Sequence, residues 1–185
     1  MGRPKALLPH TDGRTTFVAH VIRTSRAAGI KRIIVVARPG DEALKEEVGR
    51  EGALLVVNAD PDRGQISSLL AGLDAAEREY HAESIVVIPV DVPLITAGGL
   101  QILLERAASD AAPILRAAAG GRHGHPVIFK RAVFEELRAA DPEMGAKAVV
   151  RADPGRVRDV EVGDPGVTED IDTPDDYHRA FGRFV

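Results

Sequence analysis

One stretch decides the fold: Val86-Val87-Ile88-Pro89-Val90-Asp91-Val92-Pro93-Leu94-Ile95-Thr96. It continues an apolar run from Ile85 to Val90, which is typical of a strand buried within a parallel sheet. The run ends at Asp91, and because an unpaired buried carboxylate is costly, we expect this residue at the carboxyl end of the strand. Open α/β sheets bind their ligands in the crevice at that end. Asp91 is therefore a candidate ligand-binding residue; the alternative is that it opens a turn before a helix beginning near Ala97.

The composition is that of a globular protein and argues against several classes of partner. With 185 residues, 44% of them hydrophobic, the chain suits one domain over residues 1–185. A net charge of −4 and an aromatic content of 4% argue against binding to nucleic acid. The absence of cysteine excludes disulfide and thiolate chemistry. No apolar run approaches the length of a membrane span and no signal peptide is recognisable, so we expect a cytoplasmic protein without a membrane partner.

Helix and strand patterns alternate over the first two thirds of the chain, which predicts an α/β fold. Such alternation is the signature of a Rossmann-like, mostly parallel sheet with helices on both faces. After Gly120 the rhythm changes, and shorter strands and helices are expected. The predicted strands are residues 32–37, 53–57, 85–90, 113–118, 126–129 and 156–162, and the predicted helices are 15–28, 41–50, 66–80, 98–109, 131–140, 145–152 and 173–184.

The start of the chain departs from this alternating pattern. Folds of this kind usually begin with a strand whose following loop holds the phosphates of a nucleotide. Here residues 1–9 read as a loop with two prolines, and the helix at 15–28 follows directly. We therefore expect the first strand of the sheet to be missing.

Several polar residues at strand and helix ends are candidates for binding an anionic ligand. Lys5 either covers nucleotide phosphates or is a solvated terminal lysine. Asn58 follows the strand at 53–57, so its amide is expected at the ligand crevice. Ser67 and Ser68 stand where the next helix begins, and the amino end of a helix attracts phosphate. The alternative for the two serines is that they only cap that helix.

The segment from Gly121 to His125 is predicted to be a glycine-rich turn. His123 and His125 do not predict a zinc site, because no cysteine or third histidine lies nearby. The glycines instead favour a flexible loop that closes over a substrate, with Arg122 able to make a bidentate contact to a phosphate.

Asp170 and Asp172 precede the last predicted helix. Both acids can serve the dipole of that helix. Alternatively, one of them reaches the Asp91 crevice from the opposite side, because two carboxylates plus substrate phosphates form the usual magnesium site. The sequence does not distinguish which of the two would be the second metal ligand.

Five stretches together resemble one family, the MobA-like nucleotidyltransferases, and within it the molybdenum cofactor cytidylyltransferase branch. Each motif is weak singly, but their order and spacing cover nearly the whole chain. They are Met1-Gly2-x-Pro4-Lys5-x-Leu7-Leu8-Pro9, Asn58 to Gly64 with Ser67-Ser68-Leu69, Pro89-x-Asp91-x-Pro93-Leu94, Gly121-Arg122-x-Gly124-His125-Pro126-Val127 and Asp170-Ile171-Asp172-Thr173-Pro174-x-Asp176-Tyr177.

This resemblance implies an Mg²⁺-dependent enzyme with the nucleotide-diphospho-sugar transferase fold. Such an enzyme moves CMP from CTP onto molybdopterin and releases pyrophosphate, which adds a client molybdoenzyme as a further partner. Lys5 and Asp91 would be catalytic, and Asp91 and Asp172 would hold the metal. The resemblance also implies acceptor binding by Arg122 and His125, and nucleotide binding by Gly2, Lys5, Asn58, Gly64, Ser67 and Ser68.

The chemistry of these residues agrees with that activity. Phosphoryl-type transfer asks the protein mainly for positioning and charge neutralisation, and not for a covalent nucleophile. One lysine, two aspartates and a metal ion supply that need. A transferase of the same fold that uses GTP or a sugar phosphate, and a non-catalytic protein that holds the cofactor for a molybdoenzyme, are the alternatives.

The resemblance fails at the amino end, where the family has a strand and a glycine-rich loop directly before the Met-Gly pair. Met1 matches an internal methionine of the family. Our hypothesis is that the start of this chain was assigned to the family's internal methionine. We favour it because losing a central strand would expose the edges of both neighbouring strands. Without the loop, the 185-residue chain is expected to bind nucleotide poorly.

Overall fold

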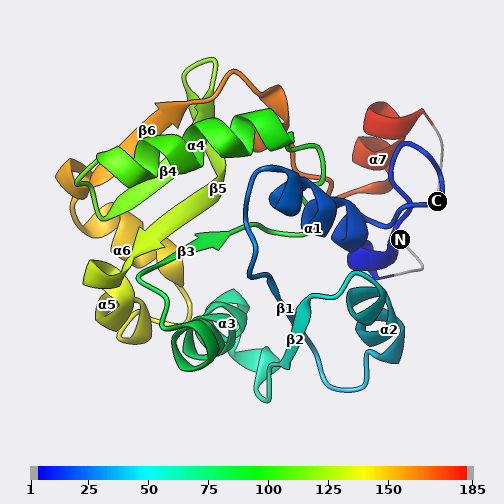
Figure 1. Cartoon of the computed structure of the whole chain (residues 1–185), viewed down its shortest axis with the longest axis horizontal. Helices are drawn as coiled ribbons and strands as arrows, with labels where there is room; N and C mark the ends of the chain where they lie inside the picture. Colours follow the sequence, from blue (N-terminus) through cyan, green and yellow to red (C-terminus); the bar gives the residue numbers. More distant parts are fainter. Residues whose placement is uncertain (1–3, 183–185) are drawn as a thin grey trace.

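The computed structural model describes residues 4–182, and it confirms the predicted α/β class. Its strands form two separate sheets (Figure 1). In the smaller sheet, β1 (Ile34–Ala37) and β2 (Leu54–Val57) run parallel. The larger sheet has the order β3-β5-β4-β6. Its strands are β3 (Ser84–Val87), β4 (Ile114–Ala119), β5 (Arg122–Lys130) and β6 (Val157–Glu161).

Both parallel and antiparallel pairs occur in the larger sheet. β4 and β6 run parallel, and β6 forms an edge of the sheet. β5 is antiparallel to both β3 and β4. It starts at Arg122, so most of the segment predicted to be a flexible glycine-rich loop is strand instead. The physical reason is pairing with β4, because His123 lies opposite Ala118 and Arg122 lies opposite Ala119. Gly124 lies so close to the Val167 carbonyl that a Cβ atom there would be 1.9 Å from the oxygen.

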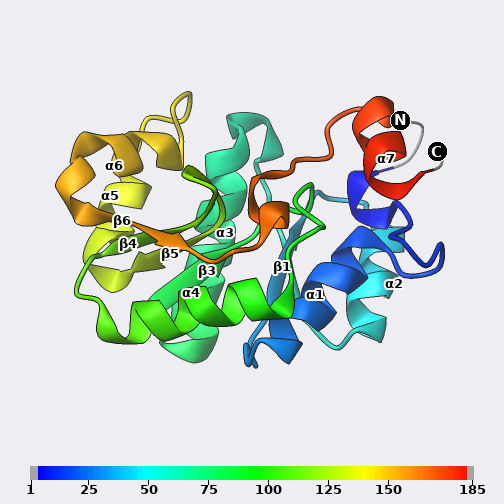
Figure 2. The same ribbon diagram turned by 90° about the horizontal axis from the view of Figure 1, so that it is seen from above.

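Helices cover both faces of the larger sheet, as Figure 2 shows for α4 on one side and α5 and α6 on the other. Alternate residues of β5 enter different cores, because successive side chains of a strand point to opposite faces. Ile128 packs with Leu103 of α4, and Phe129 packs with Leu73 of α3. The helices are α1 (Phe17–Ala27), α2 (Glu42–Arg50), α3 (Gln65–Tyr80), α4 (Ala97–Ser109), α5 (Phe134–Arg138), α6 (Ala146–Ala152) and α7 (Pro174–Phe181).

The predicted helix starts agree with the caps that the structure forms. The side chain of Thr16 caps α1, and that of Thr96 caps α4. Thr173 and Asp176 form a capping box at α7, which leaves few unpaired backbone N–H groups at that helix start. None of the helices within residues 4–182 has the length and apolar character needed to cross a membrane.

The central predicted strand is shorter and less buried than its sequence indicates. β3 ends at Val87, and Ile88 to Val90 continue without strand pairing towards Asp91. Residues 85–90 are half-buried rather than buried. The physical reason is that β3 pairs only with β5 among the described residues, so its second edge faces the space between the two sheets.

The short helix η5 (Pro165–Thr168) is held against the start of α4 by a buried carboxylate. Asp164 accepts hydrogen bonds from the Thr96 backbone N (2.7 Å), the Thr96 hydroxyl (2.8 Å) and the Gly166 backbone N (3.0 Å). Its exposure is 7%, so solvent does not replace these bonds. This contact fixes the direction in which the chain leaves for residues 170–172.

Replacing Asp164 with Ala should therefore destabilise the fold. We expect a loss of about 2–3 kcal/mol in the free energy of unfolding, because three donors lose one buried charged acceptor. Urea unfolding measures it, with Glu46→Ala on the exposed face of α2 as the control, expected within about 0.5 kcal/mol of wild type. Equal stability of the two variants would contradict this account.

Candidate functional site

The structure brings together three of the residues predicted to do chemistry. The Lys5 ammonium lies 2.5 Å from Oδ1 of Asp172 and 3.7 Å from Oδ2 of Asp91. Lys5 belongs to the short helix η1 (Lys5–Leu7), and Asp172 is 167 positions further along the chain. The side chains of Lys5 and Asp91 are each 34% exposed, so a ligand from solvent can reach them.

A backbone contact positions the two acidic segments. The Ile171 N–H donates to the Asp91 carbonyl at 2.7 Å. The Ile171 side chain is buried in a small core with Leu8, Phe17 and Tyr177. Because neighbouring side chains in an extended segment point to opposite sides, burial of Ile171 leaves the carboxylates of Asp170 and Asp172 free to face the ligand side. The apolar residue between the two acids is thus what holds them in place.

The capping contacts of α7 bear on the alternative that Asp170 and Asp172 only serve that helix. The cap is made by Thr173 and Asp176, and the Asp172 backbone N donates to Asp176 as well. The side-chain carboxylate of Asp172 is instead engaged by Lys5. Helix capping therefore does not account for the position of the Asp172 side chain.

The electrostatics of this cluster reflect burial first and the charges of neighbouring groups second. Removal of water raises the pKa of Asp170, and the nearby charge of Asp91 raises it further. For Lys5, burial disfavours the ammonium form, but the hydrogen bond to Asp172 and the charges of Asp172 and Asp91 outweigh it and raise the pKa. Lys5 thus stays protonated and offsets part of the repulsion between the carboxylates.

His125 lies beside the same cluster, from β5. Burial lowers its pKa, although the charges of Asp170 and Asp91 act in the opposite direction. The imidazole is therefore neutral at pH 7. Its Nδ1 atom is buried and has no hydrogen-bond partner among the described residues. Such a group is expected to find a partner in a bound ligand or water.

The predicted nucleotide-binding residues at α3 bond mainly to one another. Asn58 is 4% exposed, and its Nδ2 donates to the hydroxyls of Ser67 (2.8 Å) and Ser68 (3.0 Å). The Ser67 hydroxyl donates in turn to the Gly64 carbonyl. Gly64 is the N-cap of α3 with a φ of 79°, and no side chain caps this helix. Nucleotide contact by these residues stays a prediction, and Gly2 lies outside the described residues.

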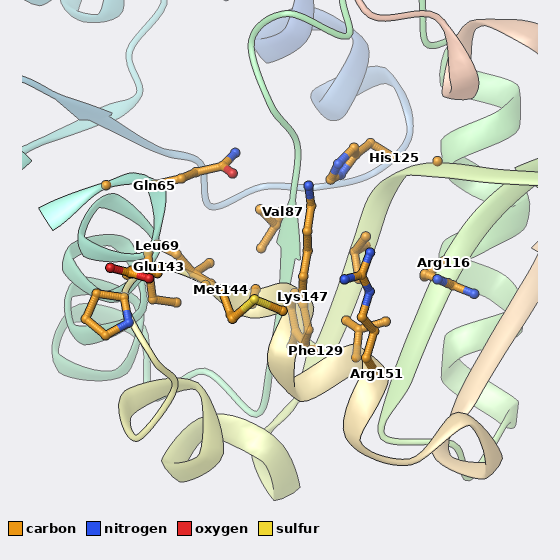
Figure 3. Close-up of a pocket in the computed structure, with 18 of the residues that line it drawn as sticks. Gln65, Leu69, Val87, Arg116, His125, Phe129, Glu143, Met144, Lys147 and Arg151 are labelled. Carbon is orange, nitrogen blue, oxygen red and sulfur yellow. The ribbon is translucent and has the colours of Figure 1, made fainter.

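A cavity of about 830 Å³ extends from this cluster between α3, β5 and α6. This volume is within the usual range for small-molecule sites. Its wall is apolar at Leu69, Phe129 and Met144, and Asp170 and His125 lie on its border. Figure 3 shows Lys147 reaching from α6 towards His125, with Phe129 and Met144 beside it.

Lys147 and Arg151 are basic residues of the cavity wall that the sequence analysis did not single out. They are four apart on α6, so they share one face of the helix, and both line the cavity. Within residues 4–182 neither side chain has an ion pair or hydrogen bond. The available signal was this pair of basic residues four apart, directly after the turn at Gly145.

Two other arginines near the cavity are already engaged. Arg116 binds both carboxylate oxygens of Asp159, at 2.7 and 3.0 Å. Arg122 donates to Thr168 and Glu169, and it is not among the lining residues. Acceptor binding by Arg122 therefore stays a prediction, whereas His125 does border the cavity.

The carboxylates of Asp91 and Asp172 fit one divalent cation only with help from a substrate. Among residues 4–182 no group of three or more His, Asp or Glu side chains is arranged to hold a metal ion by itself. The Lys5 ammonium already lies between the two carboxylates, which shows that positive charge is favoured there. Mg²⁺ is commonly bound by one or two carboxylates together with substrate phosphates and water, and this arrangement meets that need.

Comparison with known proteins gives consistent matches over nearly the whole chain. The family model of the MobA-like NTP transferase domain matches residues 1–158. Nicotine blue oxidoreductase of Paenarthrobacter nicotinovorans is 31% identical over 186 residues, covering 97% of this chain and 89% of that protein.

Solved structures also match this chain over nearly its whole length. Rv0371c from Mycobacterium tuberculosis H37Rv has a TM-score of 0.81 at 30% identity, covering 99% of this chain and 91% of that one. Its manganese complex has a TM-score of 0.77 at 29% identity, covering 97% and 91%. Molybdopterin-guanine dinucleotide biosynthesis protein A from Archaeoglobus fulgidus, with a TM-score of 0.68 at 20% identity over 98% and 90%, shows likeness of fold alone.

The raised pKa of Asp170 predicts a pH-dependent gain in stability on replacing Asp170 with Asn. An acid whose folded pKa is raised costs stability once it is ionised, so the variant should be more stable than wild type at pH 7. The difference should shrink as pH falls towards about 4, the ordinary pKa of Asp, because the wild-type group is then protonated. Urea unfolding between pH 4 and 7 measures it. Glu46→Gln is the control, and a variant less stable than wild type at pH 7 would refute the idea.

Proposed function

We propose, because this chain belongs to the MobA-like NTP transferase family and is a nucleotidyltransferase, that it transfers CMP from CTP to molybdopterin in molybdenum cofactor maturation. In this reaction an oxygen of the acceptor phosphate forms a bond to the α-phosphorus of CTP. The bond from that phosphorus to the oxygen bridging to the β-phosphate breaks, and pyrophosphate leaves. The observation that supports the proposal best is the convergence of Lys5, Asp91 and Asp172 beside a cavity.

The three charged residues divide the work of binding the triphosphate. Lys5 supplies a fixed positive charge for its phosphates, since its pKa is raised and it remains protonated. Asp91 and Asp172 are the proposed ligands of Mg²⁺, and the manganese complex of Rv0371c supports a divalent cation. When bound, the cation neutralises negative charge on the reacting phosphates. The charge of Asp91 contributes to the raised pKa of Asp170. Asp170 is therefore the alternative to Asp172 as the second metal ligand.

The cavity along β5 and α6 is the proposed acceptor site. Its apolar wall at Leu69, Phe129 and Met144 suits the flat ring system of a pterin. Lys147 is proposed to bind the acceptor phosphate, because its side chain reaches towards His125 (Figure 3), and the charges of Asp170 and Asp91 act on His125. Neutral His125 can donate or accept one hydrogen bond there without adding charge.

Replacing Asp91 or Asp172 with Asn should abolish catalysis while keeping the fold. We expect kcat/KM for pyrophosphate release to fall at least about 100-fold, because each substitution removes a charged metal ligand. The assay uses CTP, GTP and ATP with Mg²⁺ and molybdopterin, which also tests the choice of base. Asp175→Asn, on the exposed first turn of α7, is the control and should retain activity.

The outcomes separate the alternatives. If the folded wild-type chain released no pyrophosphate from any of the three nucleotides but bound molybdopterin, the non-catalytic cofactor-binding alternative would replace this proposal. Release from GTP but not CTP would keep the reaction and change the base. Wild-type turnover by Asp91→Asn would remove Asp91 from the site.

Replacing Lys147 with Ala should weaken acceptor binding selectively. We expect the KM for molybdopterin to rise about tenfold while the KM for CTP is unchanged, because one charge-assisted contact to the acceptor phosphate is lost. Steady-state kinetics with each substrate varied in turn measures this. Lys45→Ala on α2, far from the cavity, is the matched control, and an equal effect of both variants would contradict the assignment.

A further inference from the structure

Two histidines from different parts of the chain form a parallel stack beside the segment that follows Asp91. His10 lies in the loop between η1 and α1, and His20 lies within α1. Their ring centroids are 3.7 Å apart and their planes differ by 10°. Phe181 of α7 packs against the His10 ring, with the two centroids 5.2 Å apart. Both histidines are half-buried, so packing holds the two rings together.

His10 reaches the segment after Asp91 through one ring nitrogen. Its Nε2 atom lies 3.2 Å from the Pro93 carbonyl oxygen. A carbonyl can only accept a hydrogen bond, so Nε2 carries a proton and donates it. The other ring nitrogen, Nδ1, lies 2.7 Å from the Thr11 hydroxyl, which can donate to it. Neutral His10 therefore has its single proton on Nε2.

His20 contacts the same segment two residues further on. Its side chain forms a hydrogen bond with the Ile95 backbone that favours the protonated imidazole, so the backbone partner is the carbonyl, which accepts. The Thr24 hydroxyl lies 3.2 Å from Nε2 of His20. Burial is the main reason that the pKa of His20 is lowered, and the ring is neutral at pH 7. A neutral ring can stack on His10 without charge repulsion.

The segment after Asp91 is held from two sides. The carbonyls of Pro93 and Ile95 bond to the imidazoles. The Leu94 carbonyl between them packs against η5 instead, where a Cβ atom added at Gly166 would lie 2.2 Å from its oxygen. The histidine stack and η5 therefore fix the path of the chain directly after Asp91.

The stack also connects the two sides of the contact between Lys5 and Asp91. His10 follows Lys5 in the same loop, and Pro93 follows Asp91. The hydrogen bond from His10 to Pro93 thus joins the two segments whose ammonium and carboxylate are 3.7 Å apart. Ile171 holds the Asp91 carbonyl from the side of the last helix, and the stack holds the same segment from the side of Lys5.

We propose that His10 and His20 are positioning residues, whose stack sets the place of the Asp91 carboxylate relative to the Lys5 ammonium. They act through the backbone of the segment after Asp91 and not by contact with a substrate. The catalytic consequence rests on the proposed function, in which Asp91 binds a divalent cation. Groups that orient a metal ligand from outside commonly contribute about 10- to 100-fold to metal affinity or activity.

Two variants of His10 separate positioning from packing. Gln places an amide N–H near the position of Nε2, whereas Asn places it near Nδ1 and is too short to reach the Pro93 carbonyl. His10→Asn should speed hydrogen exchange at the Ile171 amide at least about tenfold, because the segment that supplies its acceptor, the Asp91 carbonyl, loses a restraint. His10→Gln should restore slow exchange. His81→Asn, at an exposed histidine that ends α3, is the control and should match wild type.

Three outcomes of the exchange experiment would overturn the proposal. The first is wild-type exchange at Ile171 in His10→Asn. The second is equal acceleration in the Asn and Gln variants. The third is acceleration that extends to the amide of Leu103, which is buried in α4, because the stack would then serve overall stability.

A measurement on the wild-type chain needs no variant. Nitrogen NMR of the imidazoles at pH 7 should find the proton of His10 on Nε2. A proton on Nδ1 alone would remove the hydrogen bond to Pro93 and refute the proposal, whether or not the variants fold.

Turnover supplies the readout that is specific to a metal ligand. In His10→Asn we expect the Mg²⁺ concentration for half-maximal pyrophosphate release to rise about tenfold, with an unchanged KM for molybdopterin. A lower kcat at unchanged Mg²⁺ dependence would indicate a merely structural role and overturn the proposal. The exchange experiment uses no substrate, so a folded wild-type chain without turnover would refute the proposed function, and exchange at Ile171 would still decide the role of the stack.

Discussion

The geometry of the site depends on one backbone hydrogen bond, from Ile171 N to the Asp91 carbonyl. It joins two segments that are far apart in the sequence, and burial of the Ile171 side chain with Leu8 and Tyr177 shields it from water. A hydrogen bond is electrostatically stronger in such surroundings than in solvent. A backbone hydrogen bond and buried apolar side chains thus hold the site together, and the carboxylates remain available for a ligand.

Gathering carboxylates in this way costs stability, and Lys5 offsets only part of that cost. The raised pKa of Asp170 records the unfavourable surroundings. Partly exposed ion pairs such as Lys5 with Asp91 contribute at most about 1 kcal/mol. The cluster therefore costs folding stability, and an added positive charge would relieve the repulsion between its carboxylates. Perturbed acids beside a cavity are typical of functional sites.

The divided sheet is the second constraint on this molecule. α3 is the element that both sheets share. On the β1 side, a Cβ atom added at Gly72 would lie 3.2 Å from the Val36 side chain. On the β5 side, Leu73 packs in the same core as Phe129. Gln65 and Leu69 of α3 line both the cavity of about 830 Å³ and the cavity of about 610 Å³ between β1 and β3, so the two cavities lie along the same helix.

The sequence by itself determined the class of fold and most element positions, and it singled out three charged residues that the structure brings together. Apolar periodicity and capping residues such as Thr16 and Thr173 act over a few positions, so they can be recognised without the tertiary structure. The motifs around Lys5, Asp91 and Asp172 likewise identified the family. The depth of burial of β3 was overestimated, because an apolar run does not reveal whether both edges of the strand are paired.

Only the tertiary structure decided which residues meet. It placed Asp172 against Lys5, tied Asn58 to Ser67 and Ser68, paired Arg122 with Glu169, and brought Lys147 to the cavity. The physical reason is that each of these contacts joins side chains through space after the cores have packed. Local patterns determine helices and strands, whereas burial of residues such as Ile171 determines the contacts between distant segments.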